Sequence, residues 1–578
     1  MEEHLKIVEE CSKSGHRILK VNSYYLHSKY DPIKEAKKFA NSHFKKNFLH
    51  ILFGLGAGYI AEALYEKMTE DEFLIIVEPF EQIVDGQNEN IQQFERTLLF
   101  KGQNKVHFKQ IIEPFVKKFG KRICFIGSPN YENIADTYYR DILQIVKDFI
   151  YMEQVNINTI NFFSKDWQRN FTFNLFFAFN DYPLKILEDY FDVPVIVASG
   201  GPSLTKQIPL LKKIRKHVVL IASGSTINTL LNYHLEPDFV VTIDGTIRNY
   251  EHFERIKLKH GHMIYSLSNH NDIRKHYHRR AFIFNTNMEV QTYAKKLLDR
   301  NIDLLLGGGS VATYALSIAN KITTGSIALI GQDLAYTDNK SHAEFNKNFK
   351  VINKEDQTKR GMFFTEGYNG DQVLTDYPFF LMKHNFEQLL KTFEHPERIY
   401  NCTEGGVKLE GYQQIPFEQF CKRFVNPKKF PPSLTEDIFS NRTIEEWKEF
   451  FARVKNEIGK HDKIERLSQE AVLLLKQNRS KTHFDPKILR KLEKIDEKLK
   501  PLFEEGMMSL IVQPIINETF HNYLPKEKES NQEFYERVFV RSLNLYLRLK
   551  AATTESKIYF KRLKRMIETK IKLLDNEG

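Results

Sequence analysis

Cysteine and long apolar stretches are both scarce in this chain of 578 residues. No apolar run approaches the roughly 18 residues of a transmembrane helix, so we expect no membrane span. The first ten residues, MEEHLKIVEE, lack the apolar segment of a secretory signal. The few cysteines form neither a Cys-x-x-Cys pair nor a metal-site spacing, which favours a reduced, cytoplasmic protein. They are Cys11, Cys124, Cys402 and Cys421.

An Asp-x-Asp motif is also missing from the whole sequence. Enzymes that move sugars from nucleotides with the help of a divalent metal usually carry such a pair, because close carboxylates hold the ion. Asp244 and Asp333 instead stand alone at the ends of two different predicted strands. We therefore expect no metal site and no bound cofactor.

Composition places the chain among ordinary globular proteins. Hydrophobic residues make up 42% and charged residues 27% of the chain. Its length exceeds what one hydrophobic core supports, so two to four domains are expected. The net charge of +10 is modest for this size. It favours an anionic small ligand over nucleic acid, although solubility alone also explains it.

The most informative stretch is VIVASGGPSL at 195–204. Its first five residues predict a buried parallel strand, Gly200 and Gly201 allow a sharp turn, and Pro202 stands where a helix begins. Ser203 can place a hydroxyl beside free N–H groups at that helix start, which is how α/β folds cradle a phosphate. The turn lacks the lysine of a Walker loop and the third glycine of a dinucleotide fingerprint. A tight turn without a ligand remains the alternative.

Similar turns recur along the following 130 residues. Further buried strands are predicted at 217–222, 239–243, 304–306 and 327–330, each running into small or polar residues. Ligands of open parallel sheets bind at the carboxyl ends of the strands, so we expect these turns to line one cleft. The candidate contacts are Ser223, Gly224, Ser225, Asn228, Asp244, Gly308, Gly309, Ser310 and Gln332.

Five blocks in order carry a resemblance to a known family: VIVASGGPSL, TIDGT, GGGSVATYALSIA, GQDLAYTDNKSHA and NCTEGGVKLEGY. The chain resembles the motility accessory factor (Maf) proteins, bacterial flagellin glycosyltransferases. The central domain of that family is similar to bacterial sialyltransferases and related to archaeal 6-hydroxymethylpterin pyrophosphokinases. The resemblance is sharp over 166–410, looser before it, and only architectural after it.

The resemblance implies an α/β protein of three domains. These are an N-terminal Rossmann-like domain over 1–165, a central parallel-sheet, sialyltransferase-like catalytic domain over 166–410, and an all-helical domain over 411–578. Proline breaks and helical periodicity independently predict four to six helices in 443–578.

The implied function is O-glycosylation of flagellin, with a nonulosonic acid of sialic, pseudaminic or legionaminic type moved from its CMP form to Ser or Thr. A CMP-sugar leaves with a single phosphate and needs no metal, in agreement with the missing Asp-x-Asp. Two alternatives stay open. One is a pterin pyrophosphokinase-like enzyme that uses ATP and Mg, and the other is a non-catalytic flagellin-binding assembly factor.

Bacterial sialyltransferases have a strand, a Gly-x-Asp and then a loop with Ser-His, an order repeated here with a shorter loop. By that resemblance His342, with a pKa near its ordinary value, is the expected general base, in a loop (332–350) that closes over the donor. Asp333 would orient a hydroxyl or support the loop, and Glu404 would bind the ribose or the sugar. An exposed histidine, a helix cap and a plain turn are the respective alternatives. His270 is the next candidate base.

Two further segments suggest contacts outside this cleft. The turn GLGAG at 54–58 lies between predicted strands, with Glu78 placed to hold a ribose or to make a turn. Residues 161–183 are rich in aromatic side chains at helical spacing, for which we expect packing between the two α/β domains. Asn170 and Asn174 on that helix are candidate nucleotide contacts by resemblance.

Overall fold

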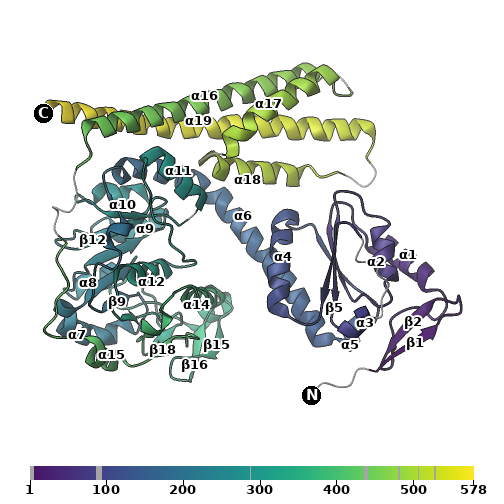
Figure 1. The fold of residues 1–578 in the computed structure, drawn as a ribbon, viewed down its shortest axis with the longest axis horizontal. Helices are drawn as coiled ribbons and strands as arrows, with labels where there is room; N and C mark the ends of the chain where they lie inside the picture. Colours follow the sequence, from purple (N-terminus) through teal and green to yellow (C-terminus); the bar gives the residue numbers. More distant parts are fainter. Residues whose placement is uncertain are drawn as a thin grey trace. The chain divides into compact units, whose positions relative to one another are not determined.

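The computed structural model describes residues 6–85, 94–286, 288–434, 441–479, 482–504, 507–525 and 529–577. The chain divides into two compact units with the boundary between Phe162 and Phe163. The long helix α6 (Asp136–Ala178) contributes residues to both (Figure 1). Each unit has its own hydrophobic core.

The first unit is built around a four-stranded parallel sheet in the order β6-β5-β4-β7. Every residue of β4 is buried, which explains why all of its residues except His50 are apolar. An antiparallel three-stranded sheet precedes it. The strands are β1 (Ile7–Cys11), β2 (Arg17–Val21), β3 (Tyr24–Tyr25), β4 (Leu49–Phe53), β5 (Phe73–Glu78), β6 (Thr97–Lys101) and β7 (Ile123–Gly127), and the helices are α1 (Pro32–His43), α2 (Tyr59–Tyr65), α3 (Glu81–Asp85), α4 (Lys105–Phe119) and α5 (Tyr131–Ile134).

The second unit contains a nine-stranded sheet in the order β18-β17-β14-β9-β10-β11-β12-β13-β8, and all of its strand pairs are parallel. The chain moves outward from β9 in one direction as far as β13 and then returns to start again at β14. The strand order therefore reverses between β9 and β14. The strands are β8 (Tyr182–Pro183), β9 (Val195–Ala198), β10 (Val219–Ser223), β11 (Phe239–Thr242), β12 (His262–Ser266), β13 (Phe282–Phe284), β14 (Ile327–Ile330), β17 (Ile399–Asn401) and β18 (Gln413–Gln414).

Helices cover both faces of this sheet, as side-chain alternation along the strands requires. Val195 and Val197 face one core, which they share with α12 and α14. Ile196 and Ala198 face the other core, with α7 and α11. The helices are α7 (Leu204–Ile214), α8 (Thr226–Asn232), α9 (Ile247–Phe253), α10 (Asn271–His276), α11 (Met288–Leu298), α12 (Val311–Ile322), α13 (Lys354–Lys359), α14 (Tyr377–Leu390) and α15 (Phe417–Phe424), and a hairpin is formed by β15 (Phe363–Glu366) and β16 (Gln372–Thr375).

The strand expected at 304–306 is wrong. Leu304 forms a single isolated bridge with Asn285, and the following residues are irregular up to α12. The segment finds no strand to pair with, because β13, which precedes Asn285, already has β12 on one side and β8 on the other.

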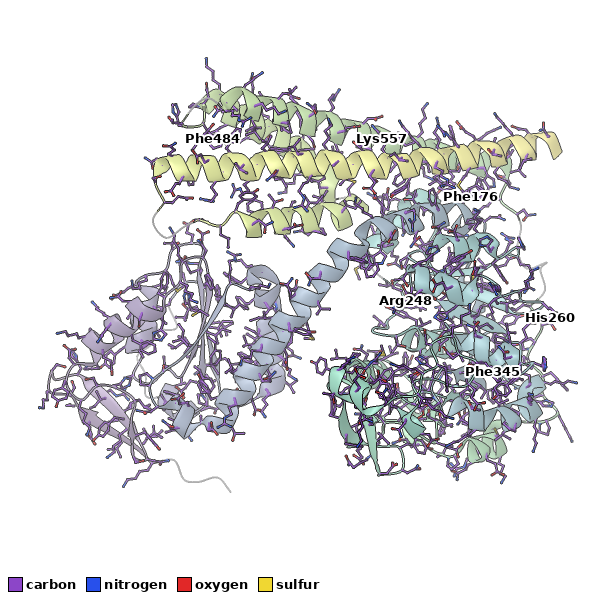
Figure 2. All side chains as sticks on the ribbon, turned by 180° about the vertical axis from the view of Figure 1, so that it is seen from behind. Phe176, Arg248, His260, Phe345, Phe484 and Lys557 are labelled. Carbon is purple, nitrogen blue, oxygen red and sulfur yellow. The ribbon has the colours of Figure 1, made fainter. Side chains whose placement is uncertain are left out.

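Four helices complete the second unit: α16 (Ile444–Asn478), α17 (Pro486–Glu504), α18 (Met507–Asn522) and α19 (Asn531–Glu577). α16 and α19 run antiparallel, as the ion pair of Lys557 with Asp462 and the hydrogen bond of Lys550 to Gln469 indicate (Figure 2). Trp447 and Phe450 on α16 belong to the same core as the sheet. No described helix is long and apolar enough to cross a bilayer.

The aromatic residues of 161–183 pack differently from the expectation. Phe179 stacks on Phe450 at a ring distance of 4.5 Å, and Phe171 lies 5.9 Å from Tyr293. They therefore join the sheet to the C-terminal helices inside the second unit. The predicted fold class is confirmed: two parallel-sheet α/β parts are followed by a helical part.

Candidate functional site

The candidate site lies at the carboxyl edge of the nine-stranded sheet, where the strand order reverses. The turn after β9 and the loop after β14 meet there. Gly201 N donates to Gly331 O over 2.8 Å, and Ser199 N donates to Ile330 O over 2.9 Å. Two segments that are 130 residues apart in sequence are thereby joined into one wall.

Asp333 fills the position at the start of α7 where a phosphate was expected. One carboxylate oxygen accepts the Ser203 hydroxyl at 2.7 Å and the Ser203 N–H at 3.2 Å, and the other accepts the Thr337 hydroxyl at 2.6 Å. The side chain is 1% exposed, and burial raises its pKa. Ser203 and Pro202 are buried beneath the turn and do not line the cleft. The two residues were predicted to cradle a phosphate, but in this structure the fold's own carboxylate takes the Ser203 donors.

The two glycines of the turn have different surroundings. A Cβ at Gly201 would lie 2.1 Å from the Asp333 carboxylate and 2.5 Å from Gly331 O. A Cβ at Gly200 would lie 2.9 Å from the amide nitrogen of Asn346 and 3.6 Å from the ring of His342. Gly201 is thus required for packing, whereas Gly200 faces the cleft.

The cleft has two connected chambers. The inner chamber, of about 210 Å³, is lined by Ser199, Gly200, Gly201, Ser223, Gly224, Ser225, Thr226, Ser310, Val311, Ala312, Gly331, Gln332, Asp333, Leu334, Ala335, Ser341, His342, Phe379 and Met382. The outer chamber, of about 810 Å³, is lined by Phe163, Gly224, Ser225, Asp244, Thr246, Ile247, Arg248, Asn249, His252, Val311, Tyr336, Ser341, His342, Asn348, Lys350, Ile352, Arg360 and Phe379. His342 belongs to both linings and so lies at their junction.

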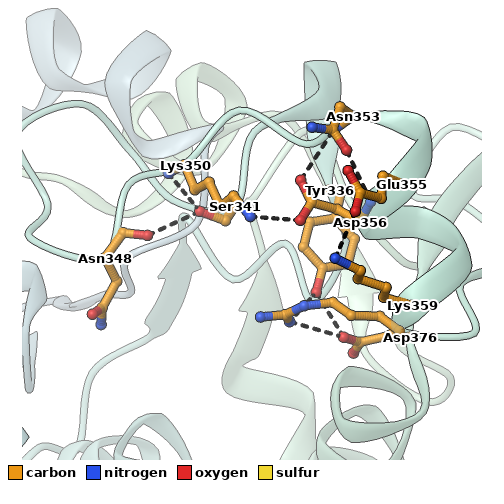
Figure 3. A network of polar contacts seen from close by, with 10 residues as sticks. Tyr336, Ser341, Asn348, Lys350, Asn353, Glu355, Asp356, Lys359 and Asp376 are labelled. Carbon is orange, nitrogen blue, oxygen red and sulfur yellow. Dashed lines mark hydrogen bonds and ion pairs between the residues drawn. The ribbon is translucent and has the colours of Figure 1, made fainter.

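The loop that carries His342 is already docked on the sheet edge. Ala343 N donates to Gly200 O over 2.9 Å, and Ala343 is fully buried. Ser341 fastens the loop on itself, because its hydroxyl donates to Asn348 O at 3.0 Å and accepts from Lys350 N at 2.8 Å (Figure 3). The loop was expected to close over the donor, but these bonds already hold it against the turn.

Burial changes the acid–base properties of His342. It lowers the pKa of the imidazole to about 4, with a further lowering from the charge of His252. The expectation of an ordinary pKa is therefore wrong. Nδ1 is buried and makes no hydrogen bond with any described residue. The ring is neutral at physiological pH, and its unpartnered nitrogen is buried in the wall of the cleft.

Most of the predicted contacts meet in these chambers, and six do not. Gly200, Gly201, Ser223, Gly224, Ser225, Ser310, Gln332, Asp333 and His342 line the inner chamber, and Asp244 lines the outer one. Pro202, Ser203, Asn228, Gly308, Gly309 and Glu404 line neither. Glu404 accepts the N–H of Phe417 at 3.0 Å, at the start of α15. Asn228 donates its side-chain N–H to Ser225 O at 3.2 Å. Both side chains stabilise turns.

Three further candidates also serve the fold. Asn170 donates to Gly245 O and Asn174 to Leu267 O, each over 2.9 Å, and both asparagines are fully buried. They hold the loops after β11 and β12 and do not line the chambers. His270 is 4% exposed, stacks on Tyr250 and also lies outside both linings.

The sequence motifs did not predict the cations of the outer chamber, Arg248, Lys350 and Arg360. Arg248 follows the Asp-Gly-Thr turn and could have been found by extending that motif by two residues. Nothing in the local sequence marks Lys350 or Arg360, since tertiary structure alone brings their loop over β11.

The glycine-rich turn of the first unit is filled by its own side chains. A Cβ at Gly54 would meet the ring of Tyr131 at 2.3 Å, and one at Gly56 would meet His27 at 2.6 Å. Glu78 accepts the N–H of Leu55 at 2.8 Å and the Tyr131 hydroxyl at 2.5 Å, and burial raises its pKa to about 7. The carboxyl group expected on a ribose thus holds this turn.

Among the described residues, no group of three or more His, Cys, Asp or Glu side chains is arranged to hold a metal ion. The polar side chains that line the cleft are instead hydroxyls, amides, the imidazoles of His252 and His342, the carboxylates of Asp244 and Asp333, and three cations. This donor set suits an organic anion such as a nucleotide better than a bare cation.

These features are those of a Rossmann-like protein whose ligand cleft lies at the switch point of a parallel sheet. Residues 169–339 match the family model described as 6-hydroxymethylpterin diphosphokinase MptE-like. The whole chain is similar to the structure of the Maf glycosyltransferase from Magnetospirillum magneticum AMB-1, with a TM-score of 0.54, 12% identity, and coverage of 100% of this chain and 93% of that one. No curated protein matches the sequence. The predicted resemblance is thereby confirmed in the fold.

Proposed function

We propose that the protein is a glycosyltransferase that moves a nonulosonic acid from its CMP form to Ser or Thr hydroxyls of flagellin in the cytoplasm. The observation that carries the proposal is the position of His342. It lies where a small chamber of nucleoside size meets a wide, cationic one, and its buried Nδ1 makes no hydrogen bond with any described residue. A neutral imidazole there can accept the proton of an acceptor hydroxyl as the hydroxyl attacks the sugar.

The reaction assigned to this cleft is a substitution at the anomeric carbon. The acceptor oxygen forms the new bond to that carbon, the bond to the phosphate oxygen breaks, and CMP leaves with the electron pair. His342 takes the hydroxyl proton. Asp333 acts as a positioning residue, because it holds the loop and α7 and its oxygens are already occupied by Ser203 and Thr337.

We propose that transfer needs no divalent metal. A single-phosphate leaving group develops less charge than a diphosphate, and the cations of the outer chamber can stabilise it. The Maf-like fold over the whole chain supports the transferase, while the family model over 169–339 keeps a pterin diphosphokinase-like enzyme as the second candidate. That second reaction uses Mg-ATP and needs carboxylates to hold the ion.

The deciding experiment titrates purified protein with CMP, ATP and hydroxymethylpterin, each with Mg and with excess EDTA. We expect CMP to bind equally in both conditions, and transfer from a CMP-sugar to flagellin to persist in EDTA. Binding of ATP and pterin only with Mg would overturn the transferase in favour of the kinase. Flagellin capture without any nucleotide binding would identify an assembly factor.

A further inference from the structure

The two chambers differ sharply in charge. The inner lining contains no lysine or arginine, and its one carboxylate, Asp333, is already hydrogen bonded. The outer lining carries three cations, Arg248, Lys350 and Arg360, and one carboxylate, Asp244. An anionic group is therefore stabilised in the outer chamber and a neutral one in the inner chamber.

The three cations are not equivalent. Lys350 pairs with Asp356 at 2.5 Å, and Arg360 donates to the Tyr336 hydroxyl at 2.8 Å and pairs with Asp376 at 3.3 Å (Figure 3). Arg248 on α9 is exposed and makes no hydrogen bond or ion pair with any described residue (Figure 2). Its planar guanidinium has no partner among the described residues and can donate two parallel hydrogen bonds to a carboxylate or phosphate.

The inner chamber contains a polar side chain, Gln332, that can hydrogen bond to a ligand. Gln332 is 4% exposed, and its carboxamide oxygen accepts the Ser199 hydroxyl at 2.5 Å. Its nitrogen makes no hydrogen bond with a described residue and is not itself buried, so it is free to donate to a ligand in the chamber. An apolar wall formed by Val311, Ala312, Leu334, Phe379 and Met382 completes the chamber. Such a space accepts a flat, neutral ring with hydrogen-bond acceptors at its edge, which is the chemistry of a nucleobase.

We infer that the donor lies with its nucleoside in the inner chamber and its oxyanions in the outer one, where Arg248 binds them and selects acidic sugars. The inference rests on the proposed function. This orientation places the bond between phosphate and sugar near His342, which belongs to both linings, and puts the sugar in the larger chamber, which has room for a protein hydroxyl beside it. The reverse orientation would put the sugar carboxylate in the chamber that has no lysine or arginine.

The test measures binding by calorimetry for wild type, Arg248→Gln and Arg255→Gln. Arg255 is an exposed cation seven residues further along that lines neither chamber, so it controls for net charge. The probes are cytidine, CMP and CMP-N-acetylneuraminate. We expect Arg248→Gln to weaken CMP-N-acetylneuraminate about 10- to 100-fold, while cytidine binding changes less than about twofold. Arg255→Gln should bind all three probes as wild type does.

The three probes together show whether Arg248 binds the sugar carboxylate or the phosphate. A loss confined to CMP-N-acetylneuraminate assigns the sugar carboxylate to Arg248, and an equal loss for CMP assigns the phosphate. Unchanged binding of both, or an equal loss for cytidine, overturns the inference. Inorganic pyrophosphate is the last probe. If wild type binds pyrophosphate, Arg248→Gln does not, and neither binds a nucleoside ligand, the transferase proposal fails and the anion site at Arg248 stands. If wild type binds none of the probes, the transferase proposal and the anion site both fail.

Discussion

At the scale of single residues, neighbouring glycines have separate tasks because their missing side chains face different surroundings. Gly201 packs against the backbone of β14 and the carboxylate of Asp333, which cannot move without breaking the start of α7. Gly200 faces the flexible ends of Asn346 and His342. The same turn therefore contains one position that serves folding and one that serves the cleft.

We expect Gly201→Ala to destabilise the protein by about 1–3 kcal/mol, because the added methyl group overlaps a carboxylate and a carbonyl. Gly200→Ala should change the melting temperature less and lower transfer by pushing aside the amide of Asn346, which would lie 2.9 Å from the added methyl group. Thermal denaturation and initial rates of the two variants check this. Equal melting temperatures for both variants would contradict the packing argument.

Removal of His342 tests the general base directly. His342→Ala should lower transfer by about 10²–10⁴-fold while binding of CMP stays near wild type. Because the imidazole with its pKa lowered to about 4 is neutral above that pH, the acid limb of the rate profile should lie near pH 4 and not near 6.5. His395→Ala, an exposed histidine outside both chambers, is the control. A limb near 6.5 would assign the base to another group.

At the scale of elements, α7 and the loop after β14 depend on each other. The start of α7 has no side-chain cap of its own, and Asp333 from the neighbouring strand end binds the Ser203 N–H instead. The same carboxylate holds Thr337 and therefore the beginning of the loop that presents His342. The helix, the strand end and the loop that carries His342 are thus stabilised as one assembly.

Asp333→Asn should cost about 1–3 kcal/mol in the free energy of unfolding, since an amide cannot accept all of these hydrogen bonds. At a temperature where the variant is folded, we expect kcat to fall only a few-fold, as for a positioning residue. Asp338→Asn, which loses only an exposed ion pair with Lys206, should be neutral within about 0.5 kcal/mol. A loss of kcat above a hundredfold with an intact fold would instead make Asp333 catalytic.

At the scale of the whole molecule, each unit carries buried groups that respond to pH. In the first unit burial lowers the pKa of His27 and of His50 to about 4, and in the second unit it does the same for His342. An unfolded chain protonates histidine near 6.5, so the stability from these neutral rings is complete above that pH and is lost as pH falls towards 4. Glu78, with its pKa raised to about 7, acts in the opposite direction between 4.5 and 7.

His27→Gln should flatten the pH dependence of stability between pH 6.5 and 4. The glutamine oxygen can still accept the Ala57 N–H, which His27 now accepts at 2.8 Å, but it cannot be protonated in this range. Denaturant unfolding of wild type and variant at pH 7.5, 6 and 5 measures the difference. Parallel curves for the two proteins would show that this ring does not couple folding to protons.

The local elements of this protein follow from its amino-acid order alone. Apolar runs such as VIVA at 195–198 and FLIIV at 73–77 specify buried parallel strands, and the glycines and small residues after them specify turns, because both properties depend on neighbours along the chain. The order of such strands also implies the edge at which the turns gather. The positions of Gly200, Ser223, Gln332 and His342 after successive strands are therefore enough to assign them to one cleft.

Which side chains face that cleft, and with what charge, depends on the tertiary fold. Asp333 caps α7 because β14 lies beside β9. Arg248 and Lys350 line the same chamber because the loop after β14 is hydrogen bonded to α9 through Lys347 and Asn348. The burial that lowers the pKa of His342 likewise comes from residues distant in sequence. Desolvation and pairing depend on distances through space, and a linear pattern of residue types does not contain them.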